Sequence, residues 1–95
     1  MTEIASIKQP PHNVELEQQI LGAVLGNNDR YHGLSFLRAD HFYDPVHADI
    51  WRNISGRIEK DHIASPVTLK TDLAEHAGLK ELGGAGYLAR MVGTS

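Results

Sequence analysis

The clearest periodic pattern in this chain lies between residues 44 and 61. Apolar side chains recur there every four residues and share one side of a predicted helix, with the single tryptophan, Trp51, beside them. The repeating positions are Val46, Ile50, Ile54 and Ile58. Asp44 has the side-chain oxygen of an N-cap, and Pro45 suits the first helical position, where no backbone donor is needed. The pattern predicts a central helix over 45–61, with the other helices packed around it.

Two shorter periodic stretches come before this helix. Asn13 is a suitable N-cap, and Glu15 and Glu17 would lie near the positive end of the helix dipole. A 3.6-residue period then holds at Leu16, Ile20, Leu21, Val24 and Leu25. We expect this helix to stop at Gly26 in a left-handed conformation. Turn-forming residues follow it, and they lead into a second, shorter helix that runs to about residue 37.

Two further helices are predicted after the central one. Ser65-Pro66 repeats the combination of cap and proline that starts the central helix. The buried positions of the helix that follows would be Leu69, Leu73 and Ala77. Gly78 is expected to end it in a Schellman motif. Gly83-Gly84 then breaks the chain again before a last helix that begins at residue 86.

No stretch alternates apolar and polar residues with period two, and no internal repeat is visible. We therefore expect an all-α fold, a small orthogonal bundle of four to five short helices. The bundle would occupy residues 13–95 as one domain, since 95 residues leave no room for a second core. Residues 1–12 are expected to form a flexible leader that ends in the stiff pair Pro10-Pro11.

Composition narrows the class of protein. The chain has no cysteine, which excludes disulfides and thiolate metal sites. It has neither a signal peptide nor an apolar run long enough for a membrane span, so we expect a soluble, cytoplasmic protein. The formal net charge is -3, and the basic residues are scattered rather than gathered in a stripe. The chain alone is therefore expected to bind nucleic acid weakly or not at all.

Six histidines raise the question of a metal site. A helical zinc pair needs histidines four residues apart with a third ligand nearby. His41 and His47 are six residues apart and lie on either side of a helix start. The others are dispersed, at His12, His32, His62 and His76. We expect these histidines to be solvated or to cap helices, and we expect no metal site.

Candidate catalytic residues have simpler explanations. Without cysteine or a G-x-S-x-G sequence, no activated nucleophile is indicated, and the serines Ser35, Ser55 and Ser65 lie in helical or capping contexts. Asp40 and Asp44 are close in sequence, but each precedes a predicted helix and would serve as a cap. The glycines at 83, 84 and 86 lack the strand and Lys-Ser/Thr pair of a phosphate loop. No catalytic, cofactor-binding or metal-binding residue is predicted.

The aromatic residues could in principle form a base-stacking surface. The acidic balance and helical spacing instead place Phe42 and Trp51 in the core. Tyr31 and Tyr43 could belong to the core or to a partner interface, because a tyrosine can lie half in each.

Several stretches in order resemble the N-terminal domain of bacterial replicative DNA helicases of the DnaB type. Residues 10–18 and 20–25 read PPHNVELEQ and ILGAVL, similar to that family's P-x-N-x-E-A-E-Q-x-[VL]-L-G-x-[LIM]-L. Residues 37–51 resemble its L-x-x-x-x-F-Y-x-P-x-H-x-x-I-[FY]. Matches continue at residues 66–69, 78–79, 82–84 and 87–88. The resemblance spans about residues 10–92, with Leu16 in place of the usual alanine and Trp51 in place of phenylalanine or tyrosine.

The resemblance implies a non-catalytic interaction domain. In this family the N-terminal domains form a collar on the hexameric ring, support hexamer assembly and help to recruit primase or a loader to the replication fork. The family continues into a helical hairpin and an ATPase domain with Walker motifs, which this sequence does not include. ATP and Mg²⁺ are therefore expected only in that further domain. The full-length protein would be an ATP-dependent 5'-3' DNA helicase. The isolated chain is expected to be a monomer or weak dimer.

An alternative prediction is a small helix-turn-helix regulator that binds DNA through residues 45–77. That reading requires a basic recognition helix, whereas residues 66–77 carry Lys70 against Asp72 and Glu75. The sequence does not mark the residues that would contact a primase or a neighbouring subunit.

Overall fold

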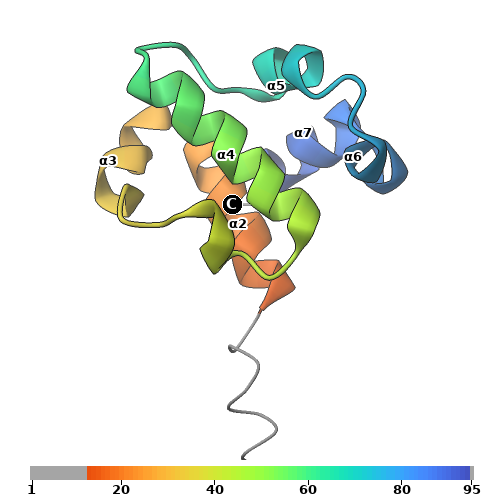
Figure 1. Cartoon of the computed structure of the whole chain (residues 1–95), viewed down its shortest axis with the longest axis horizontal. Coiled ribbons are helices and arrows are strands. Elements are labelled where there is room, and N and C mark those ends of the chain that lie inside the picture. The colour runs from red at the N-terminus through yellow and green to blue at the C-terminus, as the bar shows by residue number, and fades with distance from the viewer. Residues whose placement is uncertain (1–12, 95) are drawn as a thin grey trace, which may run out of the picture.

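The described part of the chain, residues 13–94 of a computed structural model, contains six α-helices and two short 3-10 helices. In the labels of Figure 1 the α-helices are α2 (Val14–Gly26), α3 (Tyr31–Leu34), α4 (Pro45–Glu59), α5 (Pro66–Asp72), α6 (Ala77–Leu82) and α7 (Ala85–Thr94). The 3-10 helices are η1 (Asn28–Arg30), before α3, and η2 (Ala39–His41), before α4. The all-α prediction is confirmed. The leader expected over residues 1–12 lies outside the described residues.

Helix α4 is central, as the sequence predicts. It crosses α2, with α3 on one side and α5, α6 and α7 on the other (Figure 1). The Asp44 side chain accepts a hydrogen bond from the Val46 N–H at 2.8 Å, and Pro45 is the first helical residue. The helix ends at Glu59, and Asp61 turns the chain in the left-handed region with φ of 61°. Both predicted ends of this helix are therefore confirmed to within two residues.

The core forms around Trp51, which is 1% exposed. Its ring lies 5.5 Å, centroid to centroid, from the rings of both Tyr31 and Phe42, and its Nε1–H donates to the carbonyl of Leu37 at 3.1 Å. The other buried apolar residues are Leu21, Val24, Leu25, Ile50, Ile54, Ala64, Leu69, Leu79, Tyr87, Leu88 and Met91. One prediction was wrong here, because Leu16 is 50% exposed although it continues the apolar period of α2.

The first and last described helices pack closely at Gly22. A Cβ atom at this position would lie against the backbone carbonyl of Met91 in α7, well inside van der Waals contact. Only glycine therefore allows α2 and α7 to approach this closely. The contact joins two helices at opposite ends of the described sequence.

The connector after α4 is fixed by a side chain from the start of η1. Asn28 Nδ2 donates to the carbonyls of Val24 at 2.8 Å and Ala64 at 2.7 Å, and its Oδ1 accepts from the Ala64 N–H at 2.9 Å. Because all three bonds are made by one amide, Ala64 is held against the end of α2. Ala64 is accordingly buried.

The helix predicted over residues 65–77 is in fact two helices. Helix α5 begins as expected, with Ser65 Oγ accepting from the Thr68 N–H at 3.2 Å, but it ends at Asp72. His76 then starts α6, so Gly78 is a helical residue and does not end a helix. The predicted Schellman motif occurs later, at Gly83-Gly84. There the Gly84 N–H donates to the carbonyl of Leu79 at 2.8 Å, and Gly83 has φ of 121°.

Two other predicted boundaries also differ. Gly26 remains helical, and the chain leaves α2 through Asn27 in an extended conformation with φ of -155°. An extended Asn27 can cap η1 with its own side chain, so no left-handed residue is needed. The second helix ends at Leu34 rather than near residue 37. Within residues 13–94, no helix combines the length and apolar character that crossing a membrane requires.

Candidate functional site

A buried polar cluster joins α2, α4 and α7. It consists of Glu17, Gln18, His47 and Tyr87. His47 is fully buried, with Nδ1 2.8 Å from Glu17 Oε1 and Nε2 2.6 Å from the Tyr87 hydroxyl. Gln18 Nε2 donates to the same hydroxyl at 3.0 Å. The cluster therefore connects three helices through side chains that would be costly to bury alone.

Glu17 also fixes the turn that leads into α4. Its Oε2 accepts from the Tyr43 N–H at 2.6 Å, and its Oε1 lies 3.3 Å from the Asp44 nitrogen, which donates to it. These two backbone donors precede the α4 helix and have no helical partner of their own. The carboxylate of α2 thus holds the Phe-Tyr-Asp-Pro segment in place.

The hydrogen bonds of the cluster are all satisfied when His47 carries its proton on Nδ1. The Nδ1–H then donates to the Glu17 carboxylate, and Nε2 accepts from the Tyr87 O–H, whose oxygen accepts in turn from Gln18. Burial raises the pKa of Tyr87, which keeps its hydroxyl protonated. Each polar atom in this chain of bonds has a partner.

Sequence reasoning missed this cluster. His47 was expected to be solvated or capping, and that prediction was wrong because the ring lies in the core. Glu17 was expected to lie in the first turn of its helix, near the positive end of the helix dipole, and its burial, at 7% exposed, was not predicted. The signal was present in the spacing, since Glu17 lies four residues before Leu21, and His47 lies three and four residues before Ile50 and Trp51.

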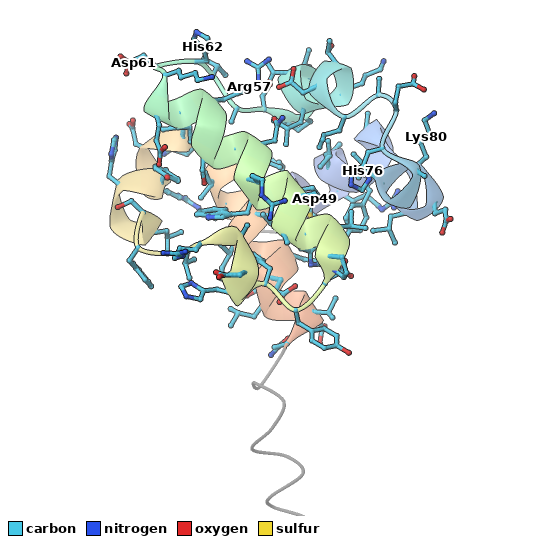
Figure 2. The ribbon with its side chains drawn as sticks, viewed as in Figure 1. Asp49, Arg57, Asp61, His62, His76 and Lys80 are labelled. Carbon is cyan, nitrogen blue, oxygen red and sulfur yellow. The ribbon has the colours of Figure 1, made fainter. Side chains whose placement is uncertain are left out.

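The other described histidines fit the solvated or capping role. His76 Nδ1 accepts from the Leu79 N–H at 3.0 Å, and its Nε2 lies 2.7 Å from Asp49 Oδ2 (Figure 2). This bond lowers the pKa of Asp49. His41 Nδ1 accepts from the Arg38 N–H at 3.0 Å, and His32 and His62 are exposed. Residues 13–94 contain no group of three or more His, Cys, Asp or Glu side chains placed to hold a metal ion. His12 lies outside the described residues.

The predictions for the aromatic and acidic residues are confirmed in part. Phe42 and Trp51 are confirmed as core, whereas Tyr31 is buried and Tyr43 is 54% exposed. Asp44 is a cap, as predicted. Asp40 lies inside η2 rather than before a helix, 3.6 Å from the Arg38 guanidinium on the surface.

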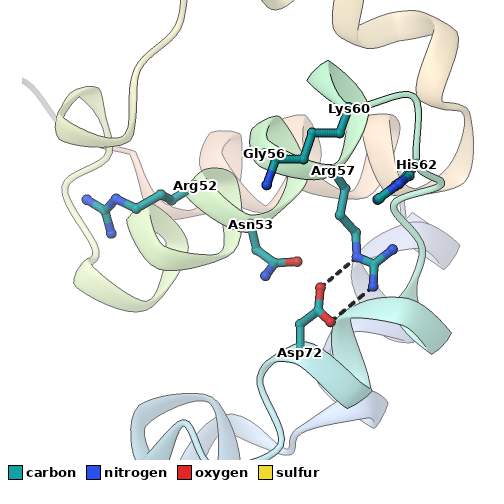
Figure 3. A pocket seen from close by; sticks show the side chains of 7 residues that line it. All are labelled: Arg52, Asn53, Gly56, Arg57, Lys60, His62 and Asp72. Atoms are coloured by element: carbon teal, nitrogen blue, oxygen red, sulfur yellow. Dashed lines mark hydrogen bonds and ion pairs between the residues drawn. The ribbon is translucent and has the colours of Figure 1, made fainter.

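A basic pocket lies on the outward face of α4. It has a volume of about 290 Å³ and is lined by Arg52, Asn53, Gly56, Arg57, Lys60, His62 and Asp72 (Figure 3). Arg57 makes a bidentate pair with Asp72, at 2.6 Å from Nε to Oδ2 and 3.0 Å from Nη2 to Oδ1. Its Nη1 also donates to the carbonyl of Ile63 at 3.2 Å. The Arg57 bond lowers the pKa of Asp72, so this wall of the pocket is a fixed ion pair.

An apolar hollow lies beside the first turn of α2, about 190 Å³ in volume. Its apolar lining is formed by Leu16, Ile20, Leu37 and Phe42. The exposure of Leu16 is therefore explained by its position at the rim of this hollow, where no described residue covers it. Apolar surface of this kind is typical of contacts with other chains.

Comparison with known proteins places this arrangement in a family. The DnaB-like helicase N-terminal domain matches residues 9–95. The chain is 43% identical over 83 residues to a replicative DNA helicase DnaB of Rickettsia prowazekii and 45% identical over 83 residues to that of Rickettsia bellii. Each alignment covers 86% of this chain but 17% of the relative, so the chain spans about a sixth of the length of these helicases.

The fold agrees with the sequence comparison. The crystal structure of the N-terminal domain of DnaB helicase from Mycobacterium tuberculosis superimposes with a TM-score of 0.80 at 32% sequence identity. The match covers 92% of this chain and 61% of that domain. The resemblance found in the sequence is confirmed over nearly its whole extent. The chain therefore belongs to the family of DnaB-like helicase N-terminal domains.

Proposed function

We propose that this chain is a non-catalytic protein-interaction domain of a replicative DNA helicase, which supports assembly of the hexamer collar and docks primase or a loader. The observation that carries the proposal is family membership over residues 9–95. The position of the family motifs supports it, because Phe42, His47 and Trp51 are buried in the core. The outward faces of the helices are then left for contacts with other chains.

The proposal assigns catalysis to another part of the helicase. ATP hydrolysis, Mg²⁺ binding and translocation on DNA would belong to an ATPase domain of the full-length protein, in the cytoplasm. This chain would need no cofactor of its own. The alternative, a helix-turn-helix regulator, gains no support from α5, which has seven residues and carries Lys70 close to Asp72.

Binding measurements with the chain itself test the proposal. Isotope-labelled chain is titrated with the primase, the loader and the full-length helicase of the same organism, and the NMR signals of its amides are followed. We expect saturable shifts with at least one of these proteins and no ATP hydrolysis by the chain alone. If none of the three shifts any signal, the proposed docking function is overturned.

Self-association is tested separately. Light scattering across a wide concentration range should give the mass of a monomer at low concentration, with at most a gradual rise toward that of a dimer. A stable hexamer of the isolated chain would contradict the expectation that it is a monomer or weak dimer.

A further inference from the structure

His76 makes two hydrogen bonds that respond in opposite ways to a second proton on its ring. Its Nδ1 accepts from the Leu79 N–H at 3.0 Å, and its Nε2 lies 2.7 Å from Asp49 Oδ2 of α4 (Figure 2). A backbone N–H can only donate, so Nδ1 carries no proton and the proton of the neutral ring lies on Nε2. The neutral ring therefore caps α6 and ties it to α4.

The cap bond is placed where α6 depends on it. The Leu79 N–H belongs to the first turn of the helix, where the backbone supplies no acceptor. The Leu79 side chain is 2% exposed, and its carbonyl accepts from the Gly84 N–H at 2.8 Å. Leu79 thus links the His76 cap to the core and to the turn before α7. Because α6 has only six residues, its first turn is a large part of it.

A second proton on His76 breaks one bond and strengthens the other. The imidazolium has an N–H on both nitrogens, so the Nδ1–H would face the Leu79 N–H and the cap bond could not form. The bond to Asp49 would become a bond between two charged groups, which is the stronger kind. Asp49 therefore favours the charged ring, whereas the cap requires the neutral one.

The other charges around α6 are engaged elsewhere or lie at its far end. The charged groups on α6 and on the elements beside it that bear on this ring are Asp49, Arg52, Lys70, Asp72, Glu75, Lys80, Glu81 and Arg90. Arg52 donates to the other oxygen of Asp49 at 2.6 Å, and Asp72 is paired with Arg57. Glu75 lies 3.8 Å from Lys80, and Arg90 donates to the carbonyl of Leu82.

Asp49 is thus the charge in direct contact with the ring. The hydrogen bonds from His76 and Arg52 hold the pKa of Asp49 below its ordinary value. This carboxylate therefore stays ionised over the pH range in which histidines take up a proton.

We propose that His76 is a pH-sensitive latch, which holds the first turn of α6 when its ring is neutral and releases that turn when the ring is doubly protonated. The charged ring keeps Asp49 and gives up Leu79. The released turn loosens one wall of the hollow of about 220 Å³ between α5, α6 and α7, whose apolar lining is Leu73, Ala74, Leu79 and Ala85. The domain then offers a different surface at α6 in mild acid than at neutral pH. The latch does not depend on the proposed docking function.

Two NMR measurements on the chain itself test the latch. The ring nitrogens of His76 report its protonation, and the hydrogen-exchange protection factor of the Leu79 amide reports the cap bond. Both are followed between about pH 8 and about pH 5.5, where histidines titrate. We expect the protection factor of Leu79 to fall about fivefold, the effect of losing a typical N-cap, in step with uptake of the second proton. The amide of Ile54, in the buried part of α4, should keep its protection.

Two variants assign the effect to the ring and to its carboxylate. His76→Asn keeps a side chain that caps helices but cannot titrate, so the protection of Leu79 should no longer depend on pH. Asp49→Asn removes the charge that favours the imidazolium, so the release of α6 should move to lower pH. His62→Asn, which replaces an exposed histidine after α4, is the matched control and should keep the profile of the parent chain.

The latch is overturned if the ring stays neutral down to about pH 5.5 or if a doubly protonated ring leaves the Leu79 protection unchanged. An equal loss of protection at Ile54 also overturns it, because the whole domain would then be opening. The parent profile in His76→Asn would assign the effect to another group and reject the latch. An unshifted midpoint in Asp49→Asn would reject the part given to that carboxylate.

Discussion

Glu17 and His47, thirty residues apart in the chain, meet in the core with Oε1 2.8 Å from Nδ1. The same carboxylate accepts from the backbone before α4, and the same imidazole bonds Tyr87 of α7. One pair of side chains therefore determines how three helices meet. This role accounts for the charged residue and the histidine in two of the motifs that identify the family.

Glu17→Ala should destabilise the domain by about 3–5 kcal/mol, because it leaves a buried imidazole N–H and two backbone N–H groups without an acceptor. Urea unfolding followed by circular dichroism measures the change. Glu15→Ala, an exposed glutamate of the same helical turn, is the control and should stay within about 0.5 kcal/mol of the parent chain. A Glu17 variant as stable as that control would show that the cluster does not hold the helices together.

Gly22→Ala and Gly56→Ala should change stability in opposite directions, although both replace a glycine inside a helix. At Gly22 the added methyl meets the Met91 carbonyl, so α2 and α7 must separate, at a cost of about 1–3 kcal/mol or more. At Gly56 the methyl enters open space, and the variant should gain about 0.5–1 kcal/mol. Thermal melts of the two variants are compared with the parent. Stabilisation at both positions would contradict the close packing of the first and last helices.

Trp51→Ala should cost about 3–5 kcal/mol, a large part of the stability of a domain of this size. The substitution leaves a cavity between Tyr31 and Phe42 and frees the carbonyl of Leu37. Asp44→Ala, which removes only the α4 cap, should cost about 1 kcal/mol. Equilibrium unfolding gives both values. An unchanged midpoint for the Trp51 variant would refute the central place of this ring.

Some features of the fold and of the polar cluster can be predicted from the sequence, and others cannot. The caps at Asp44 and Ser65 depend on neighbours within three residues, so local spacing was enough to find them. Helical spacing could place Glu17 and His47 on the buried sides of their helices, but it does not reveal their partners, which lie 30 and 40 residues away. Gly78 was misread for the same reason, because the His76 cap and its bond to Asp49 of α4 restart a helix where a glycine suggested a stop.

Stability should fall in acid partly because of Asp72. The Arg57 guanidinium holds the pKa of this carboxyl below its ordinary value, so the pair stabilises the fold above about pH 4 and ceases to do so as the pH falls through the folded pKa. Asp72→Asn should therefore lose less stability than the parent chain between about pH 5 and about pH 2. The bond to His76 also lowers the pKa of Asp49, which acts in the same sense. The Asp72→Asn variant should therefore keep part of the acid dependence of the parent chain. Asp40→Asn, whose ion pair with Arg38 is exposed, is the control, and it should keep the acid dependence of the parent.

Alkaline conditions should also destabilise the domain. Burial raises the pKa of both Tyr31 and Tyr87, so their neutral hydroxyls are favoured in the folded state. Their contribution to the free energy of unfolding is complete below about pH 10, where the unfolded tyrosine is also neutral. It is lost as the pH rises through the pKa values of these tyrosines in the folded state. Melting temperatures between about pH 8 and about pH 11 should be level at first and then decline. A flat profile to the alkaline end would show that these hydroxyls remain accessible to solvent.

The packing of α7 against α2 has a consequence for synthesis on the ribosome. Gly22 and Gln18 are made early, but the groups they contact, Met91 and Tyr87, belong to the last helix. Until that helix has left the exit tunnel, α2 lacks its contact with α7, and the imidazole of His47 lacks its bond to Tyr87. Pairings between distant parts of a chain form late, because the intervening loop must be closed first. The nascent domain should therefore stay open to chaperones and proteases until α7 has left the exit tunnel.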